Sequence, residues 1–310
     1  MGGTFGITSG GAITDSGTQA ITGAATFTNT AGTNDAITLD DASNAFSGTV
    51  TLSTDSGSAV TVVDTTALDL LALSAASLSV TAGGAVTDSG TLAITGATTI
   101  SASGQDITLD DAASTFGTLA LTGANVAVTE NEATDLGAST VSGTFGITSG
   151  GAITDSGTQT ITGAATFTNT AGTNDAITLD DASNAFSGTV TFSTDSGSAV
   201  TVVDTTALDL LALSAASLSV TAGGAITDSG TLAVSGATTL IASGQDITLD
   251  EAASTFGTLA LTGSNVAVTE NAAMDLGAST IGGTANFNST SNVITDSGTL
   301  AITGAATINA

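Results

Sequence analysis

Four pairs of neighbouring carboxylates are the residues of this chain whose types and spacing could do chemistry. Each pair follows a short Ile-Thr-Leu run, and the pairs are Asp40 and Asp41, Asp110 and Asp111, Asp180 and Asp181, and Asp250 and Glu251. Ca²⁺ prefers oxygen ligands, so each pair is a candidate calcium site. The alternative is a structural corner, in which the acidic side chain accepts hydrogen bonds from backbone N–H groups. The chain lacks the glycine-rich nonapeptide array of stacked Ca²⁺ sites, which favours the corner.

The composition argues against catalysis by these carboxylates. The 310 residues include no Lys, Arg, His or Cys. The chain therefore has no ordinary general base near pH 7, no thiolate, no Schiff-base amine and no imidazole to activate a hydroxyl. A glycosidase uses two carboxylates in one active site, whereas this acidic pair occurs in four near-equivalent copies. We expect no enzymatic activity, and no cofactor other than Ca²⁺ at the acidic pairs.

The formal net charge is −28, because 28 acidic residues have no basic counterpart. Without Lys or Arg the chain cannot neutralise phosphates, so we expect no binding to nucleic acids or to anionic lipid headgroups. The longest apolar run, Leu68 to Leu73, is interrupted by Asp69 and is too short for membrane insertion. Met1 is followed by Gly-Gly-Thr, which is no signal peptide, so we expect any export signal to lie outside this chain.

Self-repetition organises the whole sequence. Residues 3–140 and 143–280 differ at eleven positions, and residues 283–310 begin a third copy. A shorter period lies inside each copy, because Thr-Asp-Ser-Gly-Thr begins at Thr14, Thr87, Thr154, Thr227 and Thr295. Each long repeat therefore consists of two sub-repeats of about 70 residues. Such periodicity predicts a solenoid, so we expect residues 1–310 to form one continuous body rather than two domains.

Short strands are the elements that must position the acidic pairs. Apolar and small polar residues alternate in runs such as Ile37-Thr-Leu39 and Val60-Thr-Val62, and Gly, Asn, Asp or Ser ends each run. Period two predicts strands, and only Thr65 to Ala76 invites a helix in a chain rich in Thr, Ser and Gly. Strands this short fit a parallel β-solenoid of three strands and roughly 20–24 residues per coil. We expect about 13–14 coils, with about three in each sub-repeat.

Further polar patterns fall at the corners and on the outside of such coils. The Asp of each Thr-Asp-Ser-Gly is expected to be a turn residue, with successive copies about 14 Å apart along one line. Asn29, Asn34 and Asn44 are expected to stack or to cap corners. Thr-x-Thr triplets such as Thr26 to Thr28 raise ice binding as an alternative, but they recur too sparsely to predict one unbroken face.

Three phrases, at Gly83 to Gly96, Gly104 to Ala112 and Gly123 to Glu130, carry a family resemblance. They resemble the filamentous-haemagglutinin-like and related bacterial β-strand-repeat proteins, which are often giant surface or secreted adhesins. The resemblance extends over nearly the whole chain and implies a right-handed parallel β-helix, secreted and displayed at the cell surface or forming fibres, with no catalytic residues. The chain departs from that family in lacking its amino-terminal secretion and capping domain.

Together these observations predict a non-enzymatic structural or adhesive protein that lies outside a bacterial cell as a β-helical stalk or fibre segment. The sequence begins and ends within a repeat. We therefore expect its partners to be further repeats of a longer chain, or copies of itself stacked end to end into filaments. The alternative function is a surface module that binds Ca²⁺ or a cell-surface glycan, and ice binding is a further alternative.

Overall fold

The computed structural model describes residues 2–30, 34–55, 57–170, 174–194, 197–290 and 293–310, so Met1 lies outside the described residues. The fold is a parallel β-solenoid of about 15 coils, and the described residues contain no helix. It follows that no described helix has the length and hydropathy to span a membrane. The chain consists of two compact units, which we call unit 1 (Met1–Gly150) and unit 2 (Gly151–Ala310).

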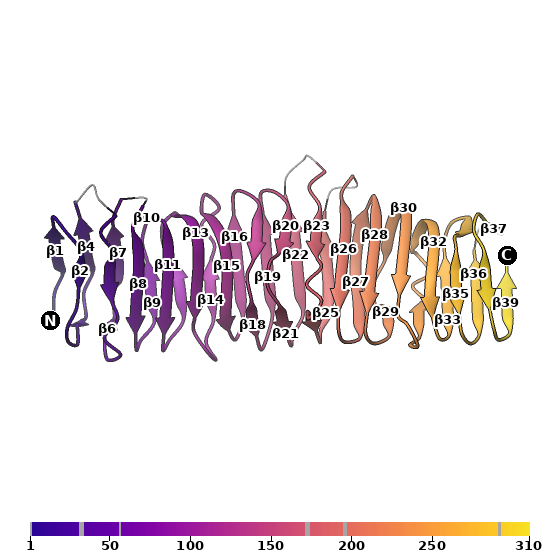
Figure 1. The fold of residues 1–310 in the computed structure, drawn as a ribbon, viewed down its shortest axis with the longest axis horizontal. Coiled ribbons are helices and arrows are strands. Elements are labelled where there is room, and N and C mark those ends of the chain that lie inside the picture. Colours follow the sequence, from indigo (N-terminus) through magenta and orange to yellow (C-terminus); the bar gives the residue numbers. More distant parts are fainter. Residues whose placement is uncertain (1, 31–33, 56, 171–173, 195–196, 291–292) are drawn as a thin grey trace. The chain divides into compact units, whose positions relative to one another are not determined.

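The strands of unit 1 are short and pair in parallel with strands of the neighbouring coils (Figure 1). They are β1 (Phe5–Ser9), β2 (Ile13–Thr14), β3 (Ala20–Ile21), β4 (Ala25–Asn29), β5 (Ile37–Leu39), β6 (Ala45–Phe46), β7 (Thr49–Ser53), β8 (Ala59–Asp64), β9 (Leu68–Leu70), β10 (Leu73–Ala75), β11 (Ser77–Ala82), β12 (Val86–Asp88), β13 (Leu92–Ser101), β14 (Ile107–Leu109), β15 (Thr115–Gly123), β16 (Val126–Glu130), β17 (Thr134–Leu136), β18 (Ser139–Val141) and β19 (Phe145–Ser149).

Two long stacks of strands define the sides of unit 1. The first side consists of β1, β4, β7, β9, β12, β14, β16 and β19, each paired with the next. The second side consists of β2, β5, β8, β11, β13, β15 and β17. Short strands such as β3 and β6 pair on a third side. Seven successive pairings lead from Phe5 to Phe145. A coil of unit 1 therefore takes roughly 20 residues, at the short end of solenoid repeats.

Unit 2 repeats this arrangement. Ala165 of β22 pairs with Val190 of β25, just as Ala25 pairs with Val50 in unit 1. Its strands are β20 (Ile153–Asp155), β21 (Gln159–Ile161), β22 (Ala165–Asn169), β23 (Ile177–Leu179), β24 (Ala185–Phe186), β25 (Thr189–Ser193), β26 (Ala199–Asp204), β27 (Leu208–Ala215), β28 (Ser217–Ala222), β29 (Ile226–Asp228), β30 (Leu232–Ile241), β31 (Ile247–Leu249), β32 (Thr255–Gly263), β33 (Val266–Glu270), β34 (Met274–Leu276), β35 (Ser279–Ile281), β36 (Ala285–Ser289), β37 (Ile294–Asp296), β38 (Leu300–Ile302) and β39 (Ala306–Asn309).

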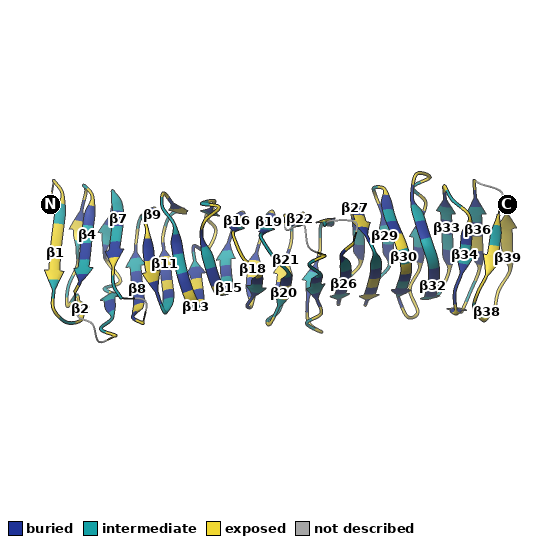
Figure 2. Ribbon diagram, turned by 90° about the horizontal axis from the view of Figure 1, so that it is seen from above, coloured by how far each residue is buried: buried dark blue, intermediate teal, exposed yellow. Residues whose placement is uncertain are grey.

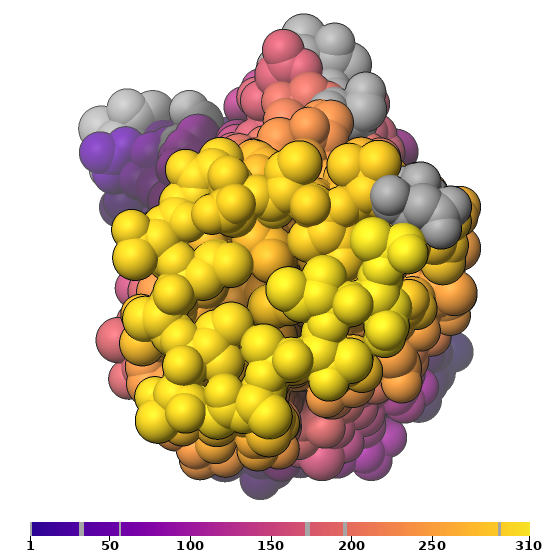
Figure 3. All heavy atoms as spheres, turned by 90° about the vertical axis from the view of Figure 1, so that its right-hand side faces the viewer, coloured from indigo at the N-terminus to yellow at the C-terminus, as the bar shows by residue number. Residues whose placement is uncertain are grey.

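Apolar ladders fill the interior of both units. Inward residues of consecutive coils stack on one another, as Ile13, Ile37 and Val60 do on the second side, and each is at most 5% exposed. Figure 2 shows the resulting alternation of buried and exposed positions along the strands. The last coil of unit 2 is uncovered at the C-terminal end, where the side chains of β39 are exposed (Figure 3).

Aromatic side chains of the first and third sides lie against one another in the interior of unit 1. The ring of Phe27 lies 5.6 Å from that of Phe5 and 5.9 Å from that of Phe46, measured between centroids. In unit 2, Phe192 stands where unit 1 has Leu52, and its ring stacks on Phe167 at 5.7 Å. At this position the two repeats therefore exchange one buried apolar side chain for another.

Coil length varies more than the sequence predicts. Leu119 pairs with Leu136, whereas Ala25 pairs with Val50, so the coil that begins at Ala25 is much the longer of the two. The strands must stack, but the corners between them can lengthen outward without disturbing the ladders. The coils take roughly 20 residues on average, at the short end of the predicted 20–24, so the chain makes about 15 of them, slightly more than the predicted 13–14.

Successive sub-repeats lie on different sides, which corrects the predicted three coils per sub-repeat. Thr14 belongs to β2 on the second side, whereas Thr87 belongs to β12 on the first side. The chain between them therefore makes three coils on the second side, from β2 to β11, and then continues directly into β12 on the first side. Strands on every side have the same alternation of inward and outward residues, so the same sequence segment can form a strand on the first side or on the second. The signature Asp residues consequently do not form one line, as the sequence had suggested.

The segment that invites a helix forms strands instead. Leu68 and Leu70 point inward from β9, and Leu73 and Ala75 point inward from β10. The inward residues alternate within each strand, but Leu71 and Ala72 lie between the two strands. The resulting interval of three residues between Leu70 and Leu73 resembles the spacing of a helix. The continuity of the solenoid over residues 1–310 stays a prediction.

Candidate functional site

The acidic pairs lie at corners directly after inward-facing strands. Asp40 and Asp41 follow β5, and Asp180 and Asp181 follow β23 in unit 2. Asp110 and Asp111 follow β14 on the first side, and Asp250 and Glu251 follow β31. The first carboxylate of each pair is exposed and the second is half-buried. Because the pairs alternate between sides, the pairs within each unit do not form a single stacked array.

The second carboxylate of three pairs closes its own corner. One Oδ1 atom accepts the backbone N–H two residues later: Asp41 from Ser43 at 3.0 Å, and Asp181 from Ser183 at 2.9 Å. Asp111 accepts from Ala113 at 2.8 Å in the same way. This is the structural corner that the sequence offered as an alternative to a calcium site.

The signature Asp residues are coupled to the acidic pairs by coil stacking, which the sequence did not reveal. Asp155 accepts the backbone N–H of Asp180 at 2.8 Å and that of Asp181 at 3.4 Å, one coil later. Its second oxygen also accepts Asn184 Nδ2 at 2.6 Å. Burial raises the pKa of Asp155 above its usual 3.8, although the hydrogen bond from Asn184 opposes the shift. Asp15, Asp88 and Asp228 receive the corresponding N–H groups of Asp40, Asp110 and Asp250.

The predicted asparagine caps have distinct geometries. Asn44 is buried and accepts the backbone N–H of Gln19 at 2.7 Å, while Asn29 donates to the carbonyl of Asp35. Asn34 has a φ of 52°, a left-handed conformation that Asn tolerates better than most residues. These contacts lie at coil corners.

Within the described ranges, no three acidic side chains are grouped so that they could hold a metal ion. At each corner the nearby carboxylate oxygens are instead directed to backbone N–H groups, as in Asp15 and Asp41. The eight acidic-pair residues therefore stay calcium candidates by residue type, and the structure gives a corner-closing role to Asp41, Asp111 and Asp181.

Four buried carboxylates form a second set of sites, which sequence reasoning missed. Each accepts the backbone N–H of a phenylalanine in the preceding part of the chain. The pairs are Phe46 with Asp64 at 3.1 Å, Phe116 with Glu130 at 3.0 Å, Phe186 with Asp204 at 3.2 Å and Phe256 with Glu270 at 2.8 Å. All four carboxylates are at most 3% exposed.

The alternation of the strands could have revealed these residues. Asp64 follows Val60 and Val62 at period two, and Glu130 follows Val126 and Val128 in the same way. A residue of that parity points inward with the valines. Burial raises the pKa of Glu130 and of Glu270 from the usual 4.5 to about 7, and it also raises the pKa of Asp204.

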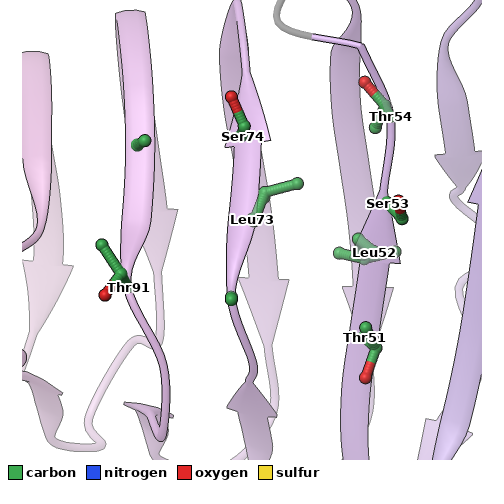
Figure 4. Close-up of a pocket in the computed structure, with 9 residues that line it drawn as sticks. Thr51, Leu52, Ser53, Thr54, Leu73, Ser74 and Thr91 are labelled. Atoms are coloured by element: carbon green, nitrogen blue, oxygen red, sulfur yellow. The ribbon is translucent and has the colours of Figure 1, made fainter.

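A shallow hollow lies on the first side of unit 1, where small side chains leave the surface depressed. Hydroxyl groups of Thr51, Ser53, Ser74 and Thr91 surround it, and Figure 4 shows these residues on neighbouring strands. An equivalent hollow in unit 2 includes the corresponding residues Thr191, Ser193, Ser214 and Thr231. Each unit therefore presents the same hydroxyl-lined depression.

The Thr side chains on the second side stack more regularly than their spacing in the sequence suggests. Thr14, Thr38, Thr61, Ser79 and Thr99 occupy one register position in consecutive coils. Ala120 occupies the next position and ends this hydroxyl ladder. From the sequence alone these Thr residues look too sparse to form one face, because the unequal coil lengths hide their alignment.

The fold and its repeated corners define a parallel β-solenoid built from tandem repeats. The chain belongs to the family described as repeats of unknown function (DUF5649), whose model matches residues 1–53, 57–122, 123–193, 197–262 and 263–310. No curated protein and no solved structure matches the chain. Nothing in these comparisons links it to the filamentous-haemagglutinin-like proteins, so that resemblance stays a prediction.

Proposed function

We propose that this chain is a non-enzymatic structural protein whose stacked coils serve as a stalk or fibre segment outside a bacterial cell. The observation that carries the proposal is that the same set of coils occurs twice with only eleven changes. The interior of each unit is filled by apolar ladders, and the hydrogen bonds of its corners connect neighbouring coils. In such an array a further repeat adds length without requiring a new site.

Chains with different numbers of the long repeat test the structural role. Residues 143–282 would be duplicated in one variant, and purified proteins would be compared by electron microscopy. Seven added coils at the strand spacing of a sheet should lengthen the particle by about 34 Å. A particle that grows wider instead of longer would refute the proposal.

A location outside the cell is supported by the resemblance to bacterial surface proteins and by a charge that disfavours nucleic acids and anionic lipids. An epitope tag placed in the source cell's own protein would be probed on intact and on permeabilised cells. Labelling of intact cells is expected. A signal that appears only after permeabilisation would contradict an extracellular location.

Further repeats of a longer chain, or other copies of this chain, are the proposed partners. Coils pair through backbone hydrogen bonds, which a coil from either source can supply. Sedimentation velocity over a wide concentration range would separate the two, since only self-association gives larger species as concentration rises. The acidic surface should keep such particles from clumping side by side.

A glycan-binding surface is the alternative that a specific observation favours. Hydroxyl groups line the hollow of each unit, and a sugar could exchange hydrogen bonds with them. Replacing Ser74 and Ser214 with valine should abolish binding in a glycan-array assay while leaving the circular dichroism spectrum unchanged. Equal binding by the wild type and this variant would remove the hollows from consideration.

The hydroxyl ladder of the second side keeps ice binding open as a further alternative. A stacked array of Thr side chains can order water, and the ladder covers five consecutive coils. Thermal hysteresis measurements on the wild type and on a Thr38→Asp, Thr61→Asp variant would test it. Hysteresis that is absent from the wild type would exclude this function.

A further inference from the structure

Glu130 and Glu270 are buried inside their coils beside neutral residues, unlike the exposed acidic residues of the chain. Glu130 ends β16 and Glu270 ends β33, and both lie inside the coil at 3% and 0% exposure. Positions paired with them in the next coil hold the neutral residues Ser149 and Ser289. An ionised carboxylate is far more costly to bury than a hydroxyl, because it loses its hydration.

Each glutamate also connects two strands. The Glu270 side chain accepts the backbone N–H of Phe256 in β32, while its own carbonyl accepts the N–H of Thr290 after β36 at 2.9 Å. The second carboxylate oxygen, Oε2, is buried and has no hydrogen-bond partner among the described residues. Glu130 makes the same side-chain contact with Phe116 of β15.

The repeats provide a natural comparison between the two sites. Beside Glu130 lie Thr134, whose side chain lowers the pKa of the carboxyl group, and Glu132, whose charge raises it. In unit 2 these positions hold Met274 and Ala272, which can do neither. Burial nevertheless has the largest effect on the pKa at both sites, so both glutamates have a raised pKa despite their different neighbours.

Few charged groups surround these carboxyls. Asp110 and Asp111 follow β14 next to Glu130, and Asp250 and Glu251 follow β31 next to Glu270. No acidic residue belongs to β15, β19, β32 or β36, which also pack against β16 and β33. No basic side chain is available to neutralise these carboxylates, because the sequence contains no Lys, Arg or His. Every charged neighbour therefore favours protonation.

We propose that Glu130 and Glu270 are proton-operated latches, which hold their coils closed when protonated and loosen them when deprotonated. The neutral carboxyl group bonds Phe116 or Phe256 without placing a charge in the core. Deprotonation leaves a buried carboxylate with no cation to neutralise it, and opening of the turn after β16 or β33 gives that carboxylate access to water. The coils would thus respond to pH changes near neutrality, a property that the structural role does not require.

The direction of the response follows from the raised pKa values. The folded state holds the proton up to a pKa of about 7, whereas the unfolded chain releases it near 4.5. The stabilisation is fully present below pH 4.5 and is lost as the pH rises through about 7. The pKa values of Asp88, Asp155, Asp204 and Asp228 are also raised by burial, so they add to the same trend.

Isosteric glutamine variants test the latches. The double variant Glu130→Gln, Glu270→Gln retains an acceptor for each phenylalanine N–H and imitates the protonated side chain. Its melting temperature should fall less than that of the wild type between pH 5 and pH 8. Glu132→Gln is the matched control, because it removes an exposed carboxylate and should leave most of the fall in place.

Amide hydrogen exchange of the wild type gives a second readout that does not depend on a folded variant. After correction for intrinsic base catalysis, the backbone amides of Phe116 and Phe256 should be less protected at pH 8 than at pH 6, because the coil that buries them opens more often. With a pKa of 4.5 in the open state and about 7 in the closed state, the opening equilibrium should rise about tenfold between pH 6 and pH 8. Equal opening at both pH values, or a double variant with the wild-type pH profile, would overturn the proposal.

Discussion

At the scale of single residues, the acidic side chains of this protein bond to the backbone of neighbouring coils. Asp155 receives two backbone N–H groups and the amide of Asn184, and Asp204 receives the N–H of Phe186. Corner N–H groups lie where the strand ladder is interrupted, so they need acceptors from side chains. A carboxylate supplies two acceptor oxygens without needing a donor of its own. This explains how a chain with 28 carboxylates and no cations uses many of them.

Replacing Asp155 with alanine should therefore destabilise unit 2. The substitution leaves the N–H groups of Asp180 and Asp181 and the buried amide of Asn184 without their acceptor. Buried donors left unsatisfied cost about 1–3 kcal/mol. Urea denaturation would measure the loss. Asp180→Ala is the control, because that side chain is exposed and its removal should change stability by less than about 0.5 kcal/mol. Equal effects of the two substitutions would contradict the capping role.

At the scale of strands and corners, the sequence was sufficient to predict strands, but it could not predict which residues of neighbouring coils lie side by side. The alternation in Ile37-Thr-Leu39 and Val60-Thr-Val62 was sufficient to predict strands and a solenoid. It could not predict how much the coils differ in length, because loops at corners do not affect the strand pattern. For the same reason the sequence could not predict the hydroxyl ladder or the hydrogen bond from the Asp40 N–H to Asp15, since both depend on the length of each coil. Buried Glu130 was missed for another reason: acidic residues were expected at corners, whereas Glu130 follows Val128 at period two and points inward with it.

Close approach at one corner gives a prediction about glycine. A Cβ atom added at Gly48 would lie 2.6 Å from the backbone carbonyl of Gly23 in the preceding coil. Real Cβ atoms do not approach that closely, so Gly48→Ala should force the coils apart and cost roughly 1–3 kcal/mol. Gly6→Ala serves as the control, because nothing lies within 4 Å of its added Cβ atom. Thermal unfolding of both variants would be compared, and an unchanged melting temperature for Gly48→Ala would show that the corner can relax.

The corners also predict the response to calcium removal. Asp41 and Asp181 direct an oxygen to the backbone of their own turn, and Asp15 and Asp155 bond to the N–H groups of the pairs. Corners that are closed without a metal should retain their stability in a chelator. We expect the melting temperature to be the same in EDTA and in millimolar Ca²⁺. A large loss in EDTA, removed by the quadruple variant Asp40→Asn, Asp110→Asn, Asp180→Asn, Asp250→Asn, would instead establish calcium binding at the acidic pairs.

At the scale of the whole molecule, uncompensated charge opposes the stacking of coils. The net charge is −28, and the described residues offer no basic side chain that could pair with it. Strands of neighbouring coils lie about 4.8 Å apart, closer than the Debye length of about 10 Å at 0.1 M salt. Carboxylates of adjacent coils therefore repel one another in dilute buffer, and the apolar ladders must overcome that repulsion.

Added salt should consequently stabilise the protein. Raising NaCl from about 0.02 M to about 0.5 M shortens the Debye length to a few ångströms and screens this repulsion, so the melting temperature should rise. The quadruple asparagine variant at the four exposed positions would carry a net charge of −24 instead of −28, and it should melt higher in dilute buffer and respond less to salt. Comparing NaCl with MgCl₂ at equal ionic strength separates screening from ion binding, because screening alone gives the same melting temperature in both. A wild-type melting temperature that does not change with NaCl would mean that the carboxylates are already too well hydrated and too far apart to oppose folding.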